Sequence, residues 1–246
     1  MTTNQLSSKQ CQQAHNYISC QHCAMEPVCQ PVQQAEQSLL LSENYLDKRI
    51  EVNAGESLFK EDEQLSAIYA VCSGSFKLYT TNKDNEKIIN FRFPGELLGE
   101  DALFPQKYVC NAIALQNSSV CKVSVNELTS HAKLVPNLQA NLVTLLSRQN
   151  YFNQQEFACL IAKKTAESLL SAFLLNMNQR INGKNDNNDN HLMLSMSREN
   201  IANFLGLRRE TLSRILSKFQ KDGLILLNGK NIALIEIQKL SLLANN

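Results

Sequence analysis

The hydrophobic pattern in the first half of the chain is that of short β-strands. Apolar and β-branched residues gather in three runs, at 68–71, 76–79 and 88–93. Turn-forming residues separate these runs, at 53–56, 73–74, 82–85 and 94–95. Many short strands with regularly spaced Gly and Pro turns are typical of a sandwich or a barrel-like roll. We predict an α+β protein whose β-roll sensor domain, a jelly roll, spans residues 32–129.

The period changes near residue 130. From 130 to 160 the chain has no Gly, and apolar residues recur at helical spacing, which predicts a long helix. A long amphipathic helix between two domains usually needs a partner, and a second copy across a two-fold axis is the economical one. The predicted dimerisation residues are Leu138, Leu142, Leu145, Leu146 and Phe152. The alternative, that this helix packs only on its own roll, stays open because Gln149 and Asn150 interrupt the apolar stripe.

A helix-turn-helix pattern occupies residues 198–217. Two closely crossing helices need a small residue in the first helix, a Gly with positive φ at the turn, and apolar residues at fixed offsets. Residues of these types stand at all seven positions: Ile201, Ala202, Leu205, Gly206, Leu207, Leu212 and Ile215. Ser197 stands where the first helix needs an N-cap. We therefore favour a helix-turn-helix over an ordinary two-helix hairpin.

A β-hairpin is predicted directly after this motif. The apolar run 224–227 is followed by Asn228-Gly229, which suits a type I′ turn, and by a second run at 231–235. Together the two motifs form a winged helix in a DNA-binding domain over residues 161–246. Another helix is expected from Ala162 to Ile181, and the polar run at 184–190 is expected to be an exposed loop.

The outward residues of the second helix suit the reading of DNA. Arg can donate two hydrogen bonds to guanine and a carboxylate can accept one from cytosine, each worth roughly 1–3 kcal/mol of discrimination. Glu210 and Arg214 are four residues apart, so both can face the major groove. A surface salt bridge between them is the alternative, and it is compatible with base reading. The predicted DNA-binding residues are Arg208, Arg209, Glu210, Thr211, Ser213, Arg214 and Lys218.

Charge is divided unevenly along the chain. Residues 1–160 hold 12 Lys and Arg against 16 Asp and Glu, whereas residues 161–246 hold 12 against 7. The resulting net charges of −4 and +5 fit a basic nucleic-acid module joined to a more acidic domain. No apolar run approaches the ~18 residues of a membrane helix, and the polar N-terminus lacks the blocks of a signal peptide. We expect a cytoplasmic protein.

Eight cysteines stand in the chain. Structural disulfides are rare in the cytosol, so clustered cysteines there more often bind metal or do redox chemistry. Cys72 and Cys159 have apolar neighbours and are expected to be small core residues. Cys20, Cys23 and Cys29 form a polar, cysteine-rich segment within residues 1–31, and Cys121 and Cys110 lie far downstream. By residue type alone, four thiolates suit either an iron–sulfur cluster or tetrahedral zinc.

Strand roll, long helix and winged helix, in this order, resemble the family of the cAMP receptor protein and the fumarate-and-nitrate-reduction regulator (FNR) over essentially the whole chain. The Glu-x-x-Ser-Arg pattern of Glu210, Ser213 and Arg214 is similar to that of the FNR branch. Arg209 departs from it, because FNR proteins usually have an apolar residue there. The cysteine spacing resembles the oxygen-sensing site of FNR. This implies a [4Fe-4S] cluster on Cys20, Cys23, Cys29 and Cys121, with Cys110 as a rival to Cys121.

The resemblance implies an oxygen-responsive transcription regulator, an activator or repressor of anaerobic genes. The cluster is expected to order the N-terminal segment and favour a homodimer. The dimer places two recognition helices about one turn of double-stranded DNA apart, ~34 Å, at a palindrome resembling TTGAT-N4-ATCAA. Oxygen is expected to remove the cluster and loosen the dimer. RNA polymerase is an expected partner, through a loop of the roll that contains Asp84 and Asn85.

The residues also bear on other functions. A thiol- or zinc-based redox regulator of the same fold stays open, as does a metal-storage or electron-transfer protein. Cyclic-nucleotide binding is not expected, because a buried phosphate needs a bidentate Arg and no Arg lies between Arg92 and Arg148. An enzyme is not expected either, since the sequence has no Ser/His/Asp nucleophile set, phosphate-cradling loop or His-Glu-x-x-His motif.

Overall fold

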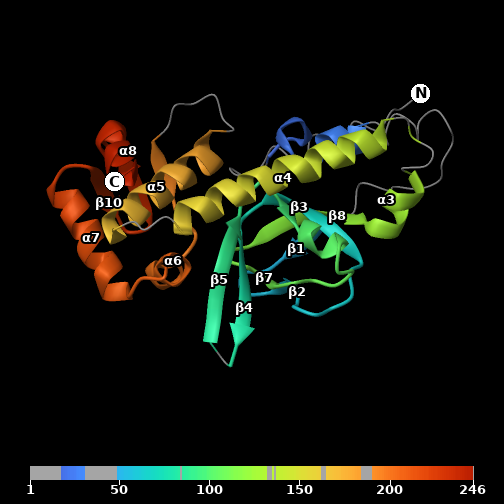
Figure 1. Cartoon of the computed structure of the whole chain (residues 1–246), viewed down its shortest axis with the longest axis horizontal. Helices are drawn as coiled ribbons and strands as arrows, with labels where there is room; N and C mark the ends of the chain where they lie inside the picture. The colour runs from blue at the N-terminus through green and yellow to red at the C-terminus, as the bar shows by residue number, and fades with distance from the viewer. Residues whose placement is uncertain are drawn as a thin grey trace. The chain divides into compact units, whose positions relative to one another are not determined.

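The computed structural model describes residues 18–30, 49–83, 85–131, 135, 137–161, 165–183 and 190–245 (Figure 1). The chain divides into two compact units. The first comprises residues up to 80 together with 90–148, and the second comprises 81–89 together with 149–246.

Within the described residues, eight short strands form the predicted roll. They are β1 (Arg49–Val52), β2 (Ser57–Phe59), β3 (Ala67–Ser73), β4 (Phe76–Asn82), β5 (Asn85–Arg92), β6 (Leu97–Leu98), β7 (Asn111–Ala114) and β8 (Ser118–Ser124). Two four-stranded sheets result, in the orders β1-β8-β3-β6 and β2-β7-β4-β5. The three predicted runs lie in β3, β4 and β5. Gly55, Gly74 and Gly95 sit at φ of 82–84° in the predicted turns, where a glycine is favoured.

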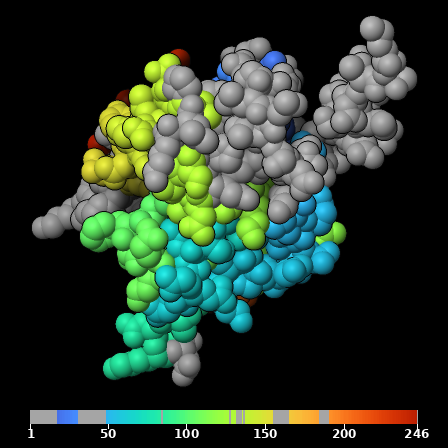
Figure 2. All heavy atoms as spheres, turned by 90° about the vertical axis from the view of Figure 1, so that its right-hand side faces the viewer, coloured from blue at the N-terminus to red at the C-terminus, as the bar shows by residue number. Residues whose placement is uncertain are grey.

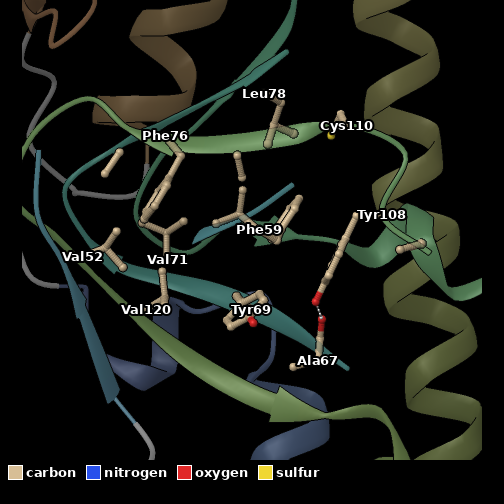
Figure 3. Packing of buried hydrophobic residues seen from close by; sticks show 14 residues of the cluster. Val52, Phe59, Ala67, Tyr69, Val71, Phe76, Leu78, Tyr108, Cys110 and Val120 are labelled. Carbon is tan, nitrogen blue, oxygen red and sulfur yellow. Dashed lines mark hydrogen bonds between the residues drawn. The ribbon is translucent and has the colours of Figure 1, made fainter. Parts of the chain in front are cut away.

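An aromatic core fills the space between the two sheets (Figure 3). Phe59 stacks on Tyr108 with ring centroids 4.0 Å apart, and the Tyr108 hydroxyl donates a 2.7 Å hydrogen bond to the Ala67 carbonyl. Tyr69 and Val71 of β3 point into this core. Because side chains alternate along a strand, Ile68 and Ala70 point to the other face of the sheet.

That other face of β3 carries a second apolar cluster. Ile68 and Ala70 meet Val123 of β8, and residues of the N-terminal segment and of a long helix complete the cluster. The N-terminal segment consists of η2 (Cys20–His22) and a helical turn at 26–30. In Figure 1 the blue N-terminal segment lies beside the long helix, and Figure 2 shows the yellow-green helical residues above the cyan strands of the roll.

Two helices, rather than one, follow β8. They are α3 (Val125–His131) and α4 (Leu138–Ile161), so the expected start near residue 130 was wrong. Asn137 has φ of 65°, which is not a helical conformation, and α4 begins directly after it. A short 3₁₀ turn, η3 (Glu100–Leu103), lies between β6 and β7. No helix within the described ranges is both long and apolar enough to span a bilayer.

The second unit contains the predicted winged helix. Its elements are α5 (Ala166–Asn182), β9 (His191–Met193), α6 (Arg198–Leu205), α7 (Arg209–Lys221), β10 (Ile225–Asn228), β11 (Asn231–Leu234) and α8 (Ile237–Asn245). Thr165 caps α5 by accepting a hydrogen bond from the Ser168 amide. Strand β9, which extends the hairpin to a sheet in the order β10-β11-β9, and helix α8 had not been predicted. Of the expected loop at 184–190, residues 184–189 lie outside the described residues.

Candidate metal centre and nucleic-acid interface

The N-terminal cysteine segment is attached to the roll and to α4 by hydrogen bonds. The Ile18 amide donates to the Cys72 carbonyl of β3 at 3.0 Å, and the Ala24 amide donates to the Gly95 carbonyl at 3.0 Å. From α4, the Asn141 side-chain amide donates to the Pro27 carbonyl at 2.7 Å. Met25 and Val28 are fully buried between the sheet and α4. The cysteine segment is therefore held by three parts of the fold, which are β3, the β5–β6 turn and α4.

This attachment places the four predicted ligand cysteines near one another. Cys23, Cys29 and Cys121 all border the second apolar cluster, and Cys20 lies in the exposed η2 turn just before Cys23. Burial raises the pKa of the Cys29 thiol, and the nearby Cys23, Cys121 and Cys20 thiolates raise it further because like charges repel. Residues nearly a hundred positions apart in sequence thus share one electrostatic environment.

The thiol chemistry of this set fits an iron–sulfur cluster. Cysteine thiolates are the standard ligands of [4Fe-4S] clusters, with one thiolate for each iron. Within the described ranges, no group of three or more Cys, His, Asp or Glu side chains is arranged to hold a single metal ion. Tetrahedral zinc needs all its donors around one centre. All four cysteines offer thiolates, the donor that both an iron–sulfur cluster and a zinc ion take.

A fifth cysteine, Cys72, adjoins this set. Its sulfur lies 3.0 Å from the Cys121 sulfur, across the β3–β8 pair. Cys121 is opposite Ala70, and the register shifts by a bulge between Val71 and Ser73, which contains Cys72. The hydrogen bond with Cys121 and burial both raise the pKa of the Cys72 thiol. Cys72 is buried, as expected of a core residue, but its contact with Cys121 was not foreseen.

Cys110 has a different environment from the ligand set. Its side chain is 1% exposed in the aromatic core between the sheets, on the opposite side of β3 and β8 from the cysteine segment. Burial raises its pKa to about 12, with further contributions from Asp101, Glu100 and Glu61 and an opposing one from Arg92. Since the N-terminal cysteines approach Cys121 and not Cys110, Cys121 is the better candidate for the fourth ligand.

Helix α4 uses the predicted dimerisation leucines within its own chain. Leu138 and Leu145 are buried in the second apolar cluster, and Leu142 and Leu146 pack against it. Within the chain, these four side chains therefore pack on the roll and the cysteine segment. Phe152 is half-exposed. The face opposite the leucines contains the exposed Ala140, Val143 and Ser147, with Tyr151 one further turn along.

The helix-turn-helix has the geometry that its sequence predicts. The Ser197 hydroxyl accepts a hydrogen bond from the Asn200 amide at the start of α6. Gly206 ends α6 in the left-handed conformation with φ of 68°. Of the six apolar positions only Leu207 is not fully buried. The inward residues of α7 are buried, as expected: Leu212, Ile215, Leu216 and Phe219.

The opposite face of α7 carries the predicted DNA-binding residues. Arg208, Arg209, Glu210, Arg214 and Lys218 are exposed, whereas Thr211 and Ser213 are half-buried. The Lys218 ammonium forms a 2.7 Å ion pair with Glu167 of α5, which raises its pKa. This pair, which the sequence did not reveal, links the C-terminal half of α7 to α5. The N-terminal half therefore presents most of the groups available to base edges.

The hairpin after α7 is present, but its turn differs from the expected one. Asn228 pairs with Asn231, so the two loop residues are Gly229 and Lys230. Gly229 has φ of 63°, and Lys230 is not among the described residues with positive φ. A type I′ turn needs positive φ at both central residues, whereas type II′ needs a Gly at the first. The turn therefore fits type II′.

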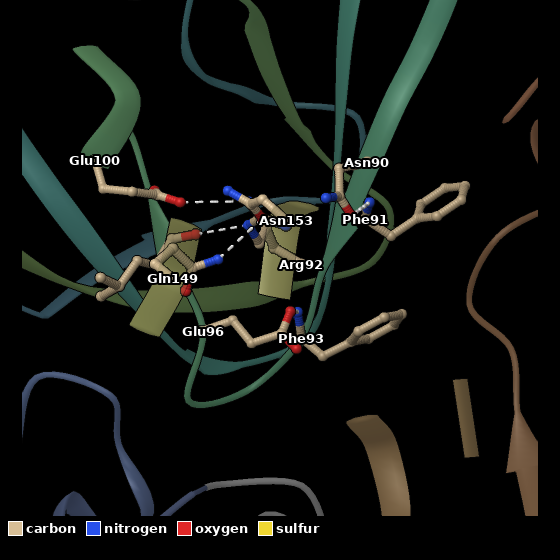
Figure 4. A network of polar contacts seen from close by, with 9 residues as sticks. Asn90, Phe91, Arg92, Phe93, Glu96, Glu100, Gln149 and Asn153 are labelled. Carbon is tan, nitrogen blue, oxygen red and sulfur yellow. Dashed lines mark hydrogen bonds and ion pairs between the residues drawn. The ribbon is translucent and has the colours of Figure 1, made fainter. Parts of the chain in front are cut away.

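The first unit also contains a buried ion pair (Figure 4). The Arg92 guanidinium donates to the Leu97 carbonyl at 2.9 Å and to the Glu100 carboxylate at 3.3 Å. Both side chains are nearly inaccessible to solvent. The charge of Arg92, the last Arg before Arg148, is thus neutralised inside the protein.

Together, a β-roll and a winged helix with an exposed basic recognition helix define a DNA-binding transcription regulator. Residues 49–133 match the cyclic nucleotide-binding domain family, and residues 170–243 match the Crp-like helix-turn-helix domain family. Electron transport regulator A of Shewanella oneidensis is 33% identical over 100% of this chain and 98% of its own length. The fumarate and nitrate reduction regulatory protein of Escherichia coli K12 is 33% identical over 93% of this chain and 91% of its own.

A solved structure agrees with these relatives. FixK2 from Bradyrhizobium japonicum superposes with a TM-score of 0.71 and 26% identity, over 80% of this chain and 96% of that one. The chain belongs to the FNR branch of the CRP/FNR family of transcription regulators. The expected fold and family are confirmed, and members of this family are regulators and not enzymes.

Proposed function

We propose that the chain is an oxygen-responsive regulator of anaerobic genes, with a [4Fe-4S] cluster held by Cys20, Cys23, Cys29 and Cys121. The observation that carries this proposal is the shared environment of these cysteines beneath α4. When bound, the cluster supplies an oxygen-labile link between the N-terminal segment and β8. The names of the relatives, which include a fumarate and nitrate reduction regulatory protein, support control of anaerobic respiration.

Ligation of the cysteines can affect α4 through the contacts that hold the cysteine segment. Leu138 and Leu145 pack on Met25 and Val28, and Asn141 bonds to Pro27. Ligation at Cys23 and Cys29 fixes the turn of chain that contains Met25, Pro27 and Val28. Loss of ligation therefore removes part of the support of α4. To change the ratio of two states from 1:99 to 99:1, one state must be stabilised relative to the other by about 5.5 kcal/mol.

A homodimer formed through α4 would use the face opposite the leucines. Ala140, Val143, Ser147 and Tyr151 recur at intervals of three and four residues, which places them on one side of a helix. All four are exposed in the single chain. Two such helices across a two-fold axis can pack closely because the central side chains are small. The two α7 helices of the dimer then read a palindrome that resembles TTGAT-N4-ATCAA.

Base reading is assigned to the N-terminal half of α7. Arg214 donates to guanine, Glu210 accepts from cytosine, and Ser213 lies beside them. Arg208, Arg209 and Thr211 stand at the start of the helix, where phosphates are attracted by the helix dipole. Lys218 remains an additional phosphate contact, weakened by its pair with Glu167.

Three further features belong to the proposal. Cyclic nucleotides are not ligands, because Arg92 is committed to Glu100 and Leu97 inside the roll. RNA polymerase is contacted through the β4–β5 turn, where Asn85 lies and where Asp84 is outside the described residues. The protein acts in the cytoplasm, where its DNA target is.

The test is anaerobic purification followed by iron and sulfide analysis and gel filtration before and after exposure to air. We expect about four irons per chain and a dimer that dissociates in air. Cys121→Ser is expected to lose the iron, whereas Cys110→Ala is expected to keep it. A colourless, iron-free dimer that still binds palindromic DNA would contradict the proposal and favour the thiol- or zinc-based regulator.

A further inference from the structure

Cys72 has no part in the proposed ligand set, yet it touches one of the ligands. The two sulfur atoms, of Cys72 and Cys121, are 3.0 Å apart, and they belong to adjacent antiparallel strands. A disulfide needs its sulfurs at about 2.05 Å with the two Cβ atoms directed toward each other. The bulge at Cys72 already brings the sulfurs within about 1 Å of that separation. At 3.0 Å the two sulfur atoms are in contact, so the pair is placed for a bond to form between them.

We propose that Cys72 and Cys121 form a disulfide in the cluster-free chain, and that this bond withholds Cys121 from the cluster. The inference rests on the proposed function in so far as Cys121 is a cluster ligand. While the Cys121 sulfur is bound to iron it cannot also bond to Cys72. Cluster and disulfide are therefore mutually exclusive states of one sulfur atom.

The chemistry balances with a peroxide as the oxidant. The Cys121 thiolate attacks hydrogen peroxide, whose O–O bond breaks, and the products after proton transfer are a sulfenic acid and water. The Cys72 sulfur then displaces the sulfenic oxygen, which leaves as a second water, and the S–S bond forms. Two thiols are oxidised by two electrons in all, and one peroxide is reduced to two waters.

The surroundings favour Cys121 as the first thiol to react. It is the more exposed of the pair, since Cys72 is only 7% exposed. Cys72 is buried beside it and suits the second, resolving step.

A disulfide here would act on cluster assembly. Cys20, Cys23 and Cys29 could still bind iron, but the fourth position would lack its thiolate. Re-formation of the cluster after oxidative loss would then require a thiol reductant as well as iron and sulfide. The chain would report peroxide exposure by remaining inactive after oxygen has been removed.

The test uses the full-length chain after loss of iron in air, treated with hydrogen peroxide, alkylated and digested with trypsin without reductant. Cys72 falls in the peptide of residues 61–77, and Cys121 shares the peptide of residues 108–122 with Cys110. Cys110→Ala removes that ambiguity and is the reference protein. We expect a linked 61–77/108–122 pair, which is lost in the Cys72→Ala, Cys110→Ala double variant.

Iron uptake gives the second readout. The oxidised reference protein should regain cluster absorbance in anaerobic reconstitution only when a thiol reductant is added beforehand, whereas the variant without Cys72 should be far less dependent on it. A Cys72 that remains alkylatable after peroxide, or a Cys121 linked instead to the peptide of residues 10–48, would overturn the inference. If the linked pair forms in a protein that never holds iron, the disulfide stands and the cluster proposal fails.

Discussion

At the residue scale, side chains of the same type differ in what they can do because their neighbours differ. Three cysteines downstream of the N-terminal segment illustrate this. Cys110 is enclosed in the aromatic core, Cys121 lies beside the cysteine segment, and Cys72 touches Cys121. The same holds for the cations of α7, because Lys218 is paired with Glu167 whereas Arg214 lies on the exposed face. Burial and pairing, more than residue type, decide which groups remain available for ligands.

Replacing Arg214 by Ala is expected to relax sequence specificity. The loss of a bidentate contact to guanine should cost roughly 1–3 kcal/mol on the palindrome and much less on scrambled DNA. Lys221→Ala, at the other end of the same helix, is the control and should weaken both complexes about equally. Fluorescence anisotropy titrations on the two duplexes at one salt concentration measure both effects. An equal loss on both duplexes by Arg214→Ala would show that Arg214 contacts only phosphates.

At the scale of elements, the roll is closed by tight turns and linked to α4 by the cysteine segment. Gly74 joins β3 to β4 with φ of 83°, next to the Ser118 backbone of β8. The segment at 18–30 fills the space between β3 and α4 and shares one apolar cluster with both. Its secondary structure is short, so its order depends on these contacts and on the proposed ligation.

Gly74→Ala is expected to destabilise the roll more than Gly55→Ala. Both glycines have φ near +82°, so both substitutions place a side chain in the left-handed conformation, at a cost of about 1–2 kcal/mol. A Cβ at Gly74 would also stand 2.6 Å from the Ser118 Cα, whereas one at Gly55 would meet nothing within 4 Å. Urea unfolding compares the free energies of unfolding. Equal losses would show that the β3–β4 turn relaxes without cost.

Asn141→Ala is expected to loosen the cysteine segment without unfolding the roll. It removes the hydrogen bond to the Pro27 carbonyl, whose net worth is about 0.5–1.5 kcal/mol. The expected result is faster loss of cluster absorbance in air, with the midpoint of urea unfolding nearly unchanged. Gln139→Ala, an exposed position on the same helix, should behave like the unaltered protein. An unchanged rate of cluster loss would show that Asn141 does not support the segment.

At the scale of the whole molecule, α4 has two faces with different environments. One face packs on the roll and the cysteine segment, and the opposite face is exposed in the single chain. This division allows the proposed ligation to influence the proposed dimer contact through one rigid element. The uneven charge of the chain fits the same organisation, because the excess of positive charge lies in the part that contains the winged helix.

Val143→Asp is expected to prevent dimer formation in the anaerobic protein. Val143 is 65% exposed on the outer face of α4, and a buried carboxylate pair across a two-fold axis would be strongly unfavourable. Phe104→Asp, which introduces the same charge at a 96% exposed apolar residue of the roll, should leave the dimer intact. Anaerobic gel filtration with iron analysis distinguishes the outcomes. An iron-loaded Val143→Asp dimer would show that another surface pairs the chains.

Much of this protein was determined by the sequence alone. Local rules predicted the apolar runs of β3, β4 and β5, the Gly turns, the N-cap at Ser197 and the left-handed Gly206, because each depends on residues that are neighbours in the chain. The inward face of α7 followed from helical periodicity. The family followed from motif spacing. None of these features required knowledge of a distant contact.

Only the tertiary structure decided which distant side chains meet. Helical periodicity showed that α4 has an apolar face, and the tertiary structure packs its leucines on the cysteine segment and the roll. Likewise, the spacing of the cysteines could not place Cys72 against Cys121, because that contact depends on the register and the bulge of β3 and β8. Periodicity defines the face of an element, whereas packing among all the elements determines its partner.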